Sequence, residues 1–128
     1  MKVCVIIPVF NEQDFIKKSV ESLIDQTIKP AEVIYVNDNS TDNSKNIIKN
    51  LIGNCEWIRV IDHKSVQEHV PGSKVIEAFN FGLKNLETQF DIICKFDGDI
   101  ILPKNYIEKI IEIFHEKEKV GIAGGNLY

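Results

Sequence analysis

The sequence predicts an α/β fold with a Rossmann-like, mostly parallel sheet and helices on both faces. Two observations predict it: apolar and amphipathic segments alternate along all 128 residues, and the apolar segments are short and continuous. Continuous apolar strands separated by helices are typical of parallel sheets with right-handed crossovers. We expect a single domain over residues 1–128, because no linker, repeat or low-complexity segment divides the chain.

Each predicted strand except the last is followed by apolar residues at helical spacing. The predicted strands are 3–7, 33–36, 57–61, 92–96 and 120–123, and the helical segments are 16–24, 47–52, 76–86 and 107–114. Sheets of this kind bind ligands outside the carboxyl ends of their strands, at the switch point in strand order. We therefore expect the ends of the first, second and fourth strands to meet at one crevice.

The composition argues against several functional classes. With 15 basic and 19 acidic residues the net charge is −4, and no Lys/Arg cluster is present, so we expect no nucleic-acid partner. The first apolar segment contains Pro8 and is shorter than a membrane span, so we interpret it as a strand and not a signal. The three cysteines are expected to be free thiols in a reducing compartment. We expect a cytoplasmic protein, with the inner face of the membrane as the alternative for the full-length protein.

Polar residues follow three of the predicted strands. They are residues 8–12 after the first strand, 37–42 after the second and 97–99 after the fourth. Carboxylates are seldom buried without a partner, so Asp97 and Asp99 mark where a strand leaves the core for a cleft. Two hard oxygen ligands beside a flexible glycine suit Mn²⁺ or Mg²⁺ carrying a diphosphate. An aromatic ring and further carboxylates can bind a base and a ribose.

Several of these residues also have a purely structural interpretation. Asp97 and Asp99 would then form an acidic turn after a strand. Phe10 would be a core residue, and Asp42 would serve the start of a helix. The three histidines lack the spacing of metal ligands, and we interpret them as surface residues: His63, His69 and His115.

At these positions the chain resembles the family 2 glycosyltransferases of GT-A fold. The resemblance extends over the chain, through the motifs at 5–12, 22–27, 37–42, 80–83 and 97–99. Each motif is weak alone, and their order and spacing together make the resemblance specific. It implies a metal-dependent, inverting transferase that moves a sugar from a nucleotide-diphosphate sugar to a saccharide or lipid-linked acceptor. UDP-sugar is the first choice of donor, with GDP and dTDP sugars as alternatives.

The resemblance also implies roles for individual residues. The Phe10 ring stacks on the base, Glu12 and Asp38 contact base or ribose, and Asp97 contacts the ribose. Asp99 ligates the metal, Mn²⁺ or Mg²⁺, which bridges the diphosphate. A basic residue upstream of the motif at 80–83 contacts a phosphate. The complete set implied for the nucleotide-sugar is Pro8, Phe10, Glu12, Asp38, Lys74 and Asp97.

The chain departs from the family pattern in two respects. Asn37 stands where many members have aspartate, so no base contact is expected from it. Members also continue past the fifth strand into a half that supplies the acceptor site and a carboxylate general base. We therefore expect the GT-A nucleotide-sugar-binding half here, with the acceptor half and the catalytic base absent. Such a fragment would be inactive by itself and would self-associate through an exposed apolar face.

Two alternatives to an enzyme remain open at this point. The first is a non-catalytic module that binds a nucleotide without transferring a sugar. The second is a phospho-receiver signalling domain, which the length and the β/α order would also fit. A receiver needs an acidic pair directly after its first strand, and Asn11 with Glu12 is a poor pair.

Overall fold

The computed structural model describes residues 1–64 and 73–116. In this part of the chain strands and helices alternate as the sequence predicts, and the predicted strand at 120–123 and His69 lie outside the described residues. The elements are β1 (Val3–Val9), α1 (Ile16–Ile24), β2 (Glu32–Asp38), α2 (Ser44–Ile52), β3 (Ile58–His63), α3 (Ser73–Lys84), β4 (Ile92–Lys95) and α4 (Tyr106–Glu116). None of the described helices is both long enough and apolar enough to cross a membrane.

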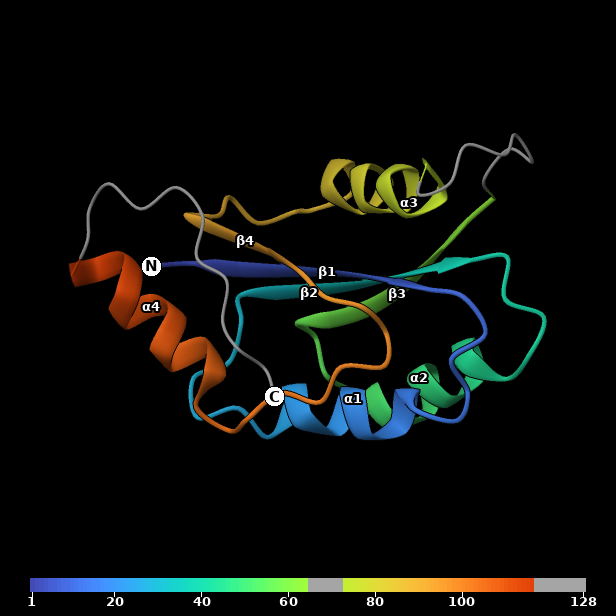
Figure 1. The fold of residues 1–128 in the computed structure, drawn as a ribbon, viewed down its shortest axis with the longest axis horizontal. Coiled ribbons are helices and arrows are strands. Elements are labelled where there is room, and N and C mark those ends of the chain that lie inside the picture. Colours follow the sequence, from blue (N-terminus) through green and yellow to red (C-terminus); the bar gives the residue numbers. More distant parts are fainter. Residues whose placement is uncertain (65–72, 117–128) are drawn as a thin grey trace.

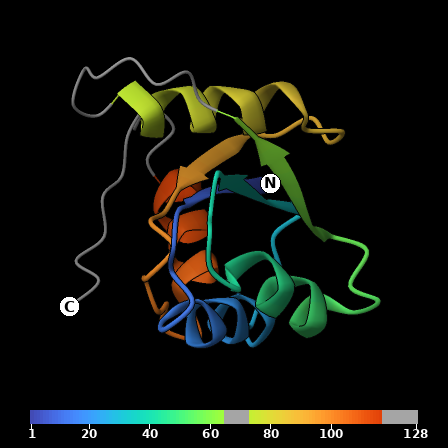
Figure 2. The same cartoon turned by 90° about the vertical axis from the view of Figure 1, so that its right-hand side faces the viewer.

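The described strands form one parallel sheet in the order β3-β2-β1-β4. Helix α3 covers one face, and α1, α2 and α4 lie on the other side (Figures 1 and 2). The α/β fold with helices on both faces is therefore confirmed. Strand order reverses at β1, which pairs with β2 on one side and β4 on the other. The switch point lies at the carboxyl ends of these strands, where such sheets bind ligands.

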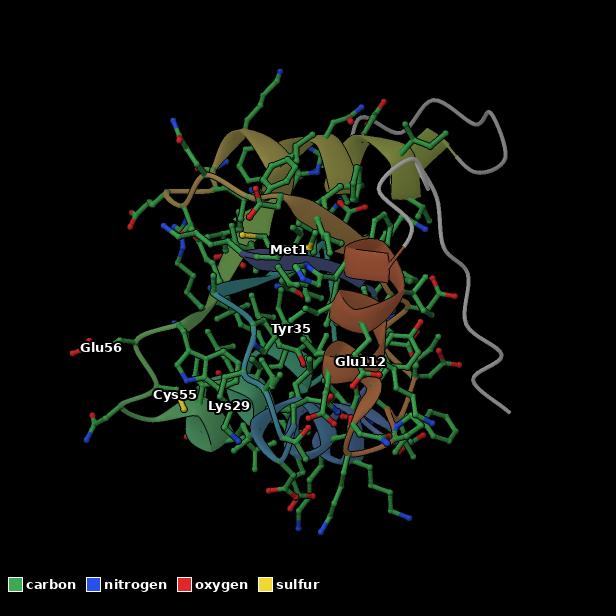
Figure 3. All side chains as sticks on the ribbon, turned by 90° about the vertical axis from the view of Figure 1, so that its left-hand side faces the viewer. Met1, Lys29, Tyr35, Cys55, Glu56 and Glu112 are labelled. Carbon is green, nitrogen blue, oxygen red and sulfur yellow. The ribbon has the colours of Figure 1, made fainter. Side chains whose placement is uncertain are left out.

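Alternating side chains of the central strands fill a core on each face of the sheet. Val5 and Tyr35 belong to the larger core, toward α1, α2 and α4, and Figure 3 places Tyr35 in this layer. Ile6 and Val36 point the other way and pack with Ala78 of α3. Burying each large apolar side chain contributes about 1.5–3 kcal/mol. Both faces therefore hold β1 and β2 rigidly beneath the loops that follow them.

Helix α3 approaches the sheet most closely at Gly82. A Cβ atom at this position would lie 2.7 Å from Cγ2 of Ile6 and 2.9 Å from Cγ2 of Val36. Any side chain would push the helix away from the sheet, because neither strand residue can move within the packed core. Gly82 thus sets the distance between α3 and the sheet. The first turn of α3 carries Lys74 to the carboxyl edge of the sheet.

Side chains of the motif at 22–27 hold the segment that joins β4 to α4. The Gln26 side chain, which is buried after α1, donates from Nε2 to the Pro103 carbonyl at 2.6 Å. Its Oε1 accepts from the Ile107 amide at 3.0 Å. The Ser22 hydroxyl accepts from the Leu102 amide at 3.0 Å. The motif at 22–27 therefore has a structural role: it holds the chain that follows Asp99.

Candidate functional site

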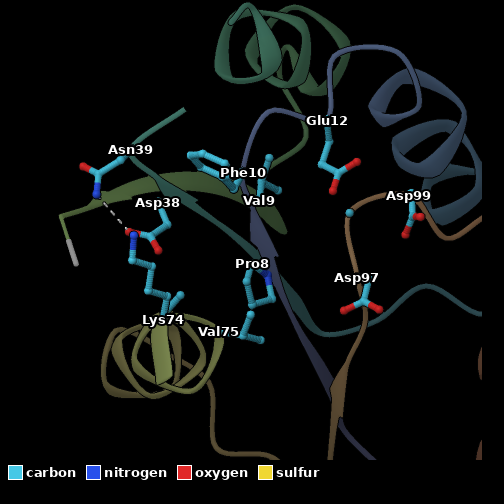
Figure 4. A pocket seen from close by; sticks show the side chains of 12 residues that line it. Pro8, Val9, Phe10, Glu12, Asp38, Asn39, Lys74, Val75, Asp97 and Asp99 are labelled. Atoms are coloured by element: carbon cyan, nitrogen blue, oxygen red, sulfur yellow. Dashed lines mark hydrogen bonds between the residues drawn. The ribbon is translucent and has the colours of Figure 1, made fainter. Parts of the chain in front are cut away.

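An open pocket lies at the carboxyl ends of β1, β2 and β4, beside the first turn of α3 (Figure 4). Its volume is about 410 Å³. Every residue that the sequence predicted for the nucleotide-sugar or the metal lines it: Pro8, Phe10, Glu12, Asp38, Lys74, Asp97 and Asp99. The other described residues that line it are Val9, Asn39, Val75, Ala78 and Gly98. The fold thus brings together residues that are spread over 92 positions of the sequence, from 8 to 99.

One side of this pocket is acidic (Figure 4). Asp97 and Asp99 follow β4, and the buried Gly98 between them packs against Glu12. A Cβ atom at 98 would lie only 3.1 Å from Cγ of Glu12. Burial raises the pKa of Glu12, and the charges of Asp99, Asp97 and Asp42 raise it further. The fold therefore places Glu12 beside the two aspartates, and negative charge accumulates on this side of the pocket.

The other side of the pocket carries Phe10, Asp38, Asn39 and Lys74 (Figure 4). Phe10 is 59 % exposed, so the interpretation of this residue as core is wrong. Asp38 is buried, and its Oδ1 accepts a hydrogen bond from Asn39 Nδ2 at 3.4 Å. Lys74 is exposed at the start of α3. An exposed ring can stack on a base, and a buried carboxylate beside it can accept a hydrogen bond from an N–H or hydroxyl group.

The loop after β1 is tied to the loop after β2 by hydrogen bonds to Asn11. Its Oδ1 accepts from the Thr41 amide at 2.8 Å, and its own amide donates to Ser40 Oγ at 3.1 Å. Asn11 has a φ of 50°, in the left-handed region that asparagine tolerates better than most residues. This turn sends the neighbouring Phe10 and Glu12 to different sides of the pocket.

Asp42 serves the start of α2, as one interpretation of the sequence predicted. Its Oδ1 accepts from the amide of Ser44 at 2.9 Å and from the Ser44 hydroxyl at 2.6 Å. Burial raises the pKa of Asp42, but the hydrogen bonds from Ser44 outweigh it and hold the pKa below its ordinary value. Asp42 is not among the pocket-lining residues and influences the site through its charge on Glu12.

The prediction that His63 is a surface residue is wrong. Its side chain is only 18 % exposed, with Nδ1 3.6 Å from Oδ1 of Asp38. The reason is that β3 continues beyond its apolar residues: His63 is the partner of Asp38 in the parallel register. Two residues after the partly buried Ile61, it lies on the α3 face of the sheet. That period of two was the signal in the sequence. His115 is exposed, as predicted.

Asn37 takes no part in the pocket. Its Nδ2 donates to Oδ1 of Asp62 at 3.0 Å, and Asp62 also pairs with Lys45 of α2. Successive residues of a strand point to opposite faces, so Asn37 faces α2 while Asp38 faces the pocket. The replacement of a family aspartate at this position therefore leaves the pocket lining unchanged.

The acidic side of the pocket fits a divalent cation that binds together with phosphate. Within residues 1–64 and 73–116, no group of three or more His, Cys, Asp or Glu side chains is arranged to hold a metal ion alone. Mg²⁺ and similar hard ions, however, are commonly bound by one or two carboxylates and completed by substrate phosphates and water. Asp97 and Asp99 supply such a pair of oxygen donors, and the charge around Glu12 favours a cation.

Residues 4–128 match the model described as Glycosyl transferase family 2. The chain is 31% identical over 127 residues to Glycosyltransferase GlyA of Streptococcus pneumoniae, covering 99% of this chain and 17% of that protein. It is 30% identical over 125 residues to the minor teichoic acid biosynthesis protein GgaA of Bacillus subtilis, covering 93% and 26%. The chain thus spans about a sixth to a quarter of the length of these relatives.

Solved structures show the same fold. S. aureus TarS in complex with UDP-GlcNAc matches with a TM-score of 0.75 and 23% identity, over 98% of this chain and 37% of that one. The mannosyltransferase PcManGT from Pyrobaculum calidifontis, in complex with GDP-Man and Mn²⁺, matches with a TM-score of 0.62 and 20% identity, over 80% and 28%. The match to the family model covers nearly the whole chain. The chain therefore belongs to glycosyltransferase family 2 and has its GT-A fold.

Proposed function

We propose that the pocket binds the nucleoside diphosphate of a sugar donor, together with Mn²⁺ or Mg²⁺, as the donor-binding half of a hexosyltransferase. One observation carries the proposal: an exposed aromatic ring, Phe10, and the carboxylate pair of Asp97 and Asp99 lie on opposite sides of the same pocket. A nucleotide with a metal-bound diphosphate has both a base to stack and a charged end to neutralise.

The residues of the pocket suggest how the nucleotide lies in it. The base stacks on Phe10, next to Pro8, and Asp38 accepts a hydrogen bond from the base or the ribose. Lys74, at the start of α3, contributes a positive charge toward a phosphate. On the acidic side, Asp97 accepts from a ribose hydroxyl, and Glu12 packs on Gly98 between the two aspartates. We favour UDP as the nucleotide because the related TarS was crystallised with UDP and UDP-GlcNAc.

Asp99 holds the divalent cation in this proposal, and Asp97 lies beside it. When bound, the cation stabilises the charge that develops on the departing nucleoside diphosphate. The protein's own contribution is placement: Gly98 lets the chain turn closely against Glu12, and Gln26 anchors the segment that follows. These contacts keep both carboxylates at the mouth of the pocket.

Transfer to the acceptor requires a base within hydrogen-bond reach of the attacking hydroxyl. The carboxylates among the described residues of this pocket are already assigned to the nucleotide or the cation, so we propose that the base lies outside the described residues. The acceptor is a saccharide or a lipid-linked saccharide, and the transfer inverts the anomeric centre. The teichoic acid role in the name of the related GgaA supports a cell-wall or polysaccharide pathway.

Calorimetric titration with UDP, GDP and dTDP, each with Mn²⁺ and with EDTA, tests the proposal. We expect UDP to bind most tightly and to bind better with Mn²⁺. Asp99→Asn should weaken the Mn²⁺-dependent binding about tenfold or more. Removing a residue that merely hydrogen-bonds to a metal ligand already lowers metal affinity by about that factor, and Asp99 is proposed as a ligand itself. Asp14→Asn, at an exposed aspartate outside the pocket, is the matched control. Equal UDP affinity with and without Mn²⁺ in the unmodified chain would overturn the metal assignment.

A further inference from the structure

His63 lies beside the carboxylate of Asp38, with its Nδ1 3.6 Å from Oδ1. The two residues are partners in the parallel register of β2 and β3, at the carboxyl ends of both strands. Asp38 lines the pocket, whereas His63 does not. Among the described residues that line the pocket, His63 is in contact with Asp38, so Asp38 is the residue through which it can act on a ligand.

The ring of His63 has little freedom to move away from Asp38. Its centroid lies 4.6 Å from that of Phe81 on α3, at an interplanar angle of 39°. Helix α3 is itself held against the sheet at Gly82. The imidazole is thus confined between an aromatic ring on one side and a carboxylate on the other.

The ring nitrogen of His63 that lies nearest the Asp38 carboxylate makes no hydrogen bond to it. Nδ1 of His63 is buried and, among the described residues, makes no hydrogen bond. Its distance of 3.6 Å from Oδ1 of Asp38 is longer than a hydrogen bond. An unpaired buried polar atom is costly, and a small rotation of either side chain would pair this one. Only a small movement is therefore needed to form the hydrogen bond between His63 and Asp38.

We propose that His63 is a positioning residue for nucleotide recognition. When a nucleotide binds, Nδ1–H of His63 donates to Oδ1 of Asp38, which fixes the carboxylate and directs Oδ2 at the base or the ribose. The neutral tautomer with the proton on Nδ1 is sufficient for this donation. The inference rests on the proposed function, because it assumes that Asp38 contacts the nucleotide.

Two substitutions separate the hydrogen bond from the packing. His63→Phe keeps a ring against Phe81 but removes the donor, and His63→Asn places an amide nitrogen where Nδ1 stood. We expect His63→Phe to weaken UDP binding about five- to tenfold, in line with the net contribution of one typical intramolecular hydrogen bond. His63→Asn should restore most of this affinity. His115→Asn, at an exposed histidine of α4, should bind UDP like the parent.

A double-mutant cycle with Asp38→Ala tests whether His63 acts through Asp38. In the Asp38→Ala background, His63→Phe should cause no further loss of UDP affinity. Pyrophosphate with Mn²⁺, which lacks a base and a ribose, should bind all variants equally. The inference is wrong if the parent and His63→Phe bind UDP equally well. It is also wrong if the losses of UDP affinity caused by His63→Phe and by Asp38→Ala are additive in the double variant. If the parent binds no nucleotide, the proposed function fails first, and the inference with it.

Discussion

The two ends of the parallel sheet place a glutamate in opposite electrostatic surroundings. At the amino end, Glu32 is 6 % exposed and accepts from the amides of Glu87 at 3.0 Å and Thr88 at 2.9 Å. Arg59 Nη2 also donates to it, at 3.1 Å. At the carboxyl end, Glu12 instead lies among other carboxylates. The amino end therefore surrounds its glutamate with hydrogen-bond donors, and the carboxyl end surrounds its glutamate with other carboxylates.

The pKa values of the two glutamates move in opposite directions. Burial raises the pKa of Glu32, but hydrogen bonds from Thr88, Arg59 and Glu87 outweigh it, so the pKa lies below the ordinary value. Burial and the charges of neighbouring carboxylates raise the pKa of Glu12. Charged Glu32 thus stabilises the fold, and this contribution is lost as the pH falls through its folded pKa.

Glu12 has the opposite linkage to stability. Because its folded pKa is raised, its stabilising contribution is complete below its unfolded pKa and is lost as the pH rises through the folded pKa. Above its folded pKa, the charged Glu12 therefore weakens the fold. Ionisable groups with shifted pKa values are concentrated at functional sites. The difference between the two ends indicates which edge of the sheet serves binding and which serves folding.

Removing Glu32 should have the largest effect on stability. Glu32→Ala leaves two backbone amides without their acceptor and removes the carboxylate partner of Arg59, which keeps its bond to the Asn85 carbonyl. We expect a loss of about 2–3 kcal/mol in the free energy of unfolding. Urea denaturation measures this loss. Glu56→Ala, at an exposed glutamate, should change stability little. A loss for Glu32→Ala no larger than that of the control would mean that the amino end is not the stabilising edge.

Removing Phe10 should change binding without changing stability. The ring is 59 % exposed, so Phe10→Ala removes little buried surface from the folded chain. We expect UDP binding to weaken by about 1–3 kcal/mol, the range for one base–aromatic stack. Phe15→Ala is the matched control, because Phe15 is 56 % exposed and does not line the pocket. Unchanged UDP affinity in a folded Phe10→Ala chain would show that the base binds elsewhere.

The sequence predicted the elements and the composition of the pocket. Continuous apolar strands such as Val3–Val9 need burial on both faces, which the crossover helices of a parallel sheet provide. Strand ends of a parallel sheet meet at one edge, so the predicted residues had to converge. What each residue contacts within the pocket was harder to predict. Glu12 lies with Asp97 and Asp99 because Asn11 takes a positive φ, and that depends on bonds to residues about 30 positions away.

His63 shows a second limit of the sequence. The apolar residues of its strand end at Ile61, and the strand continues for two more residues because its backbone pairs with β2. Pairing of this kind depends on the partner strand, so the local pattern of β3 ends too early. The period of two places His63 on the same face as Ile61 only once β3 is known to extend that far, and its contacts with Asp38 and Phe81 are tertiary.

The contrast between the two glutamates is tested most directly by the thermal unfolding of Glu12→Gln and Glu32→Gln, measured without ligand. Glutamine keeps the size of each side chain and removes only its charge. At neutral pH, Glu12→Gln should raise the unfolding temperature by about 1–3 °C, and Glu32→Gln should lower it by more. The gain from Glu12→Gln should disappear at acid pH, where Glu12 is already protonated. A lower unfolding temperature for both variants at neutral pH would contradict the account, because both ends of the sheet would then use their glutamates to stabilise the fold.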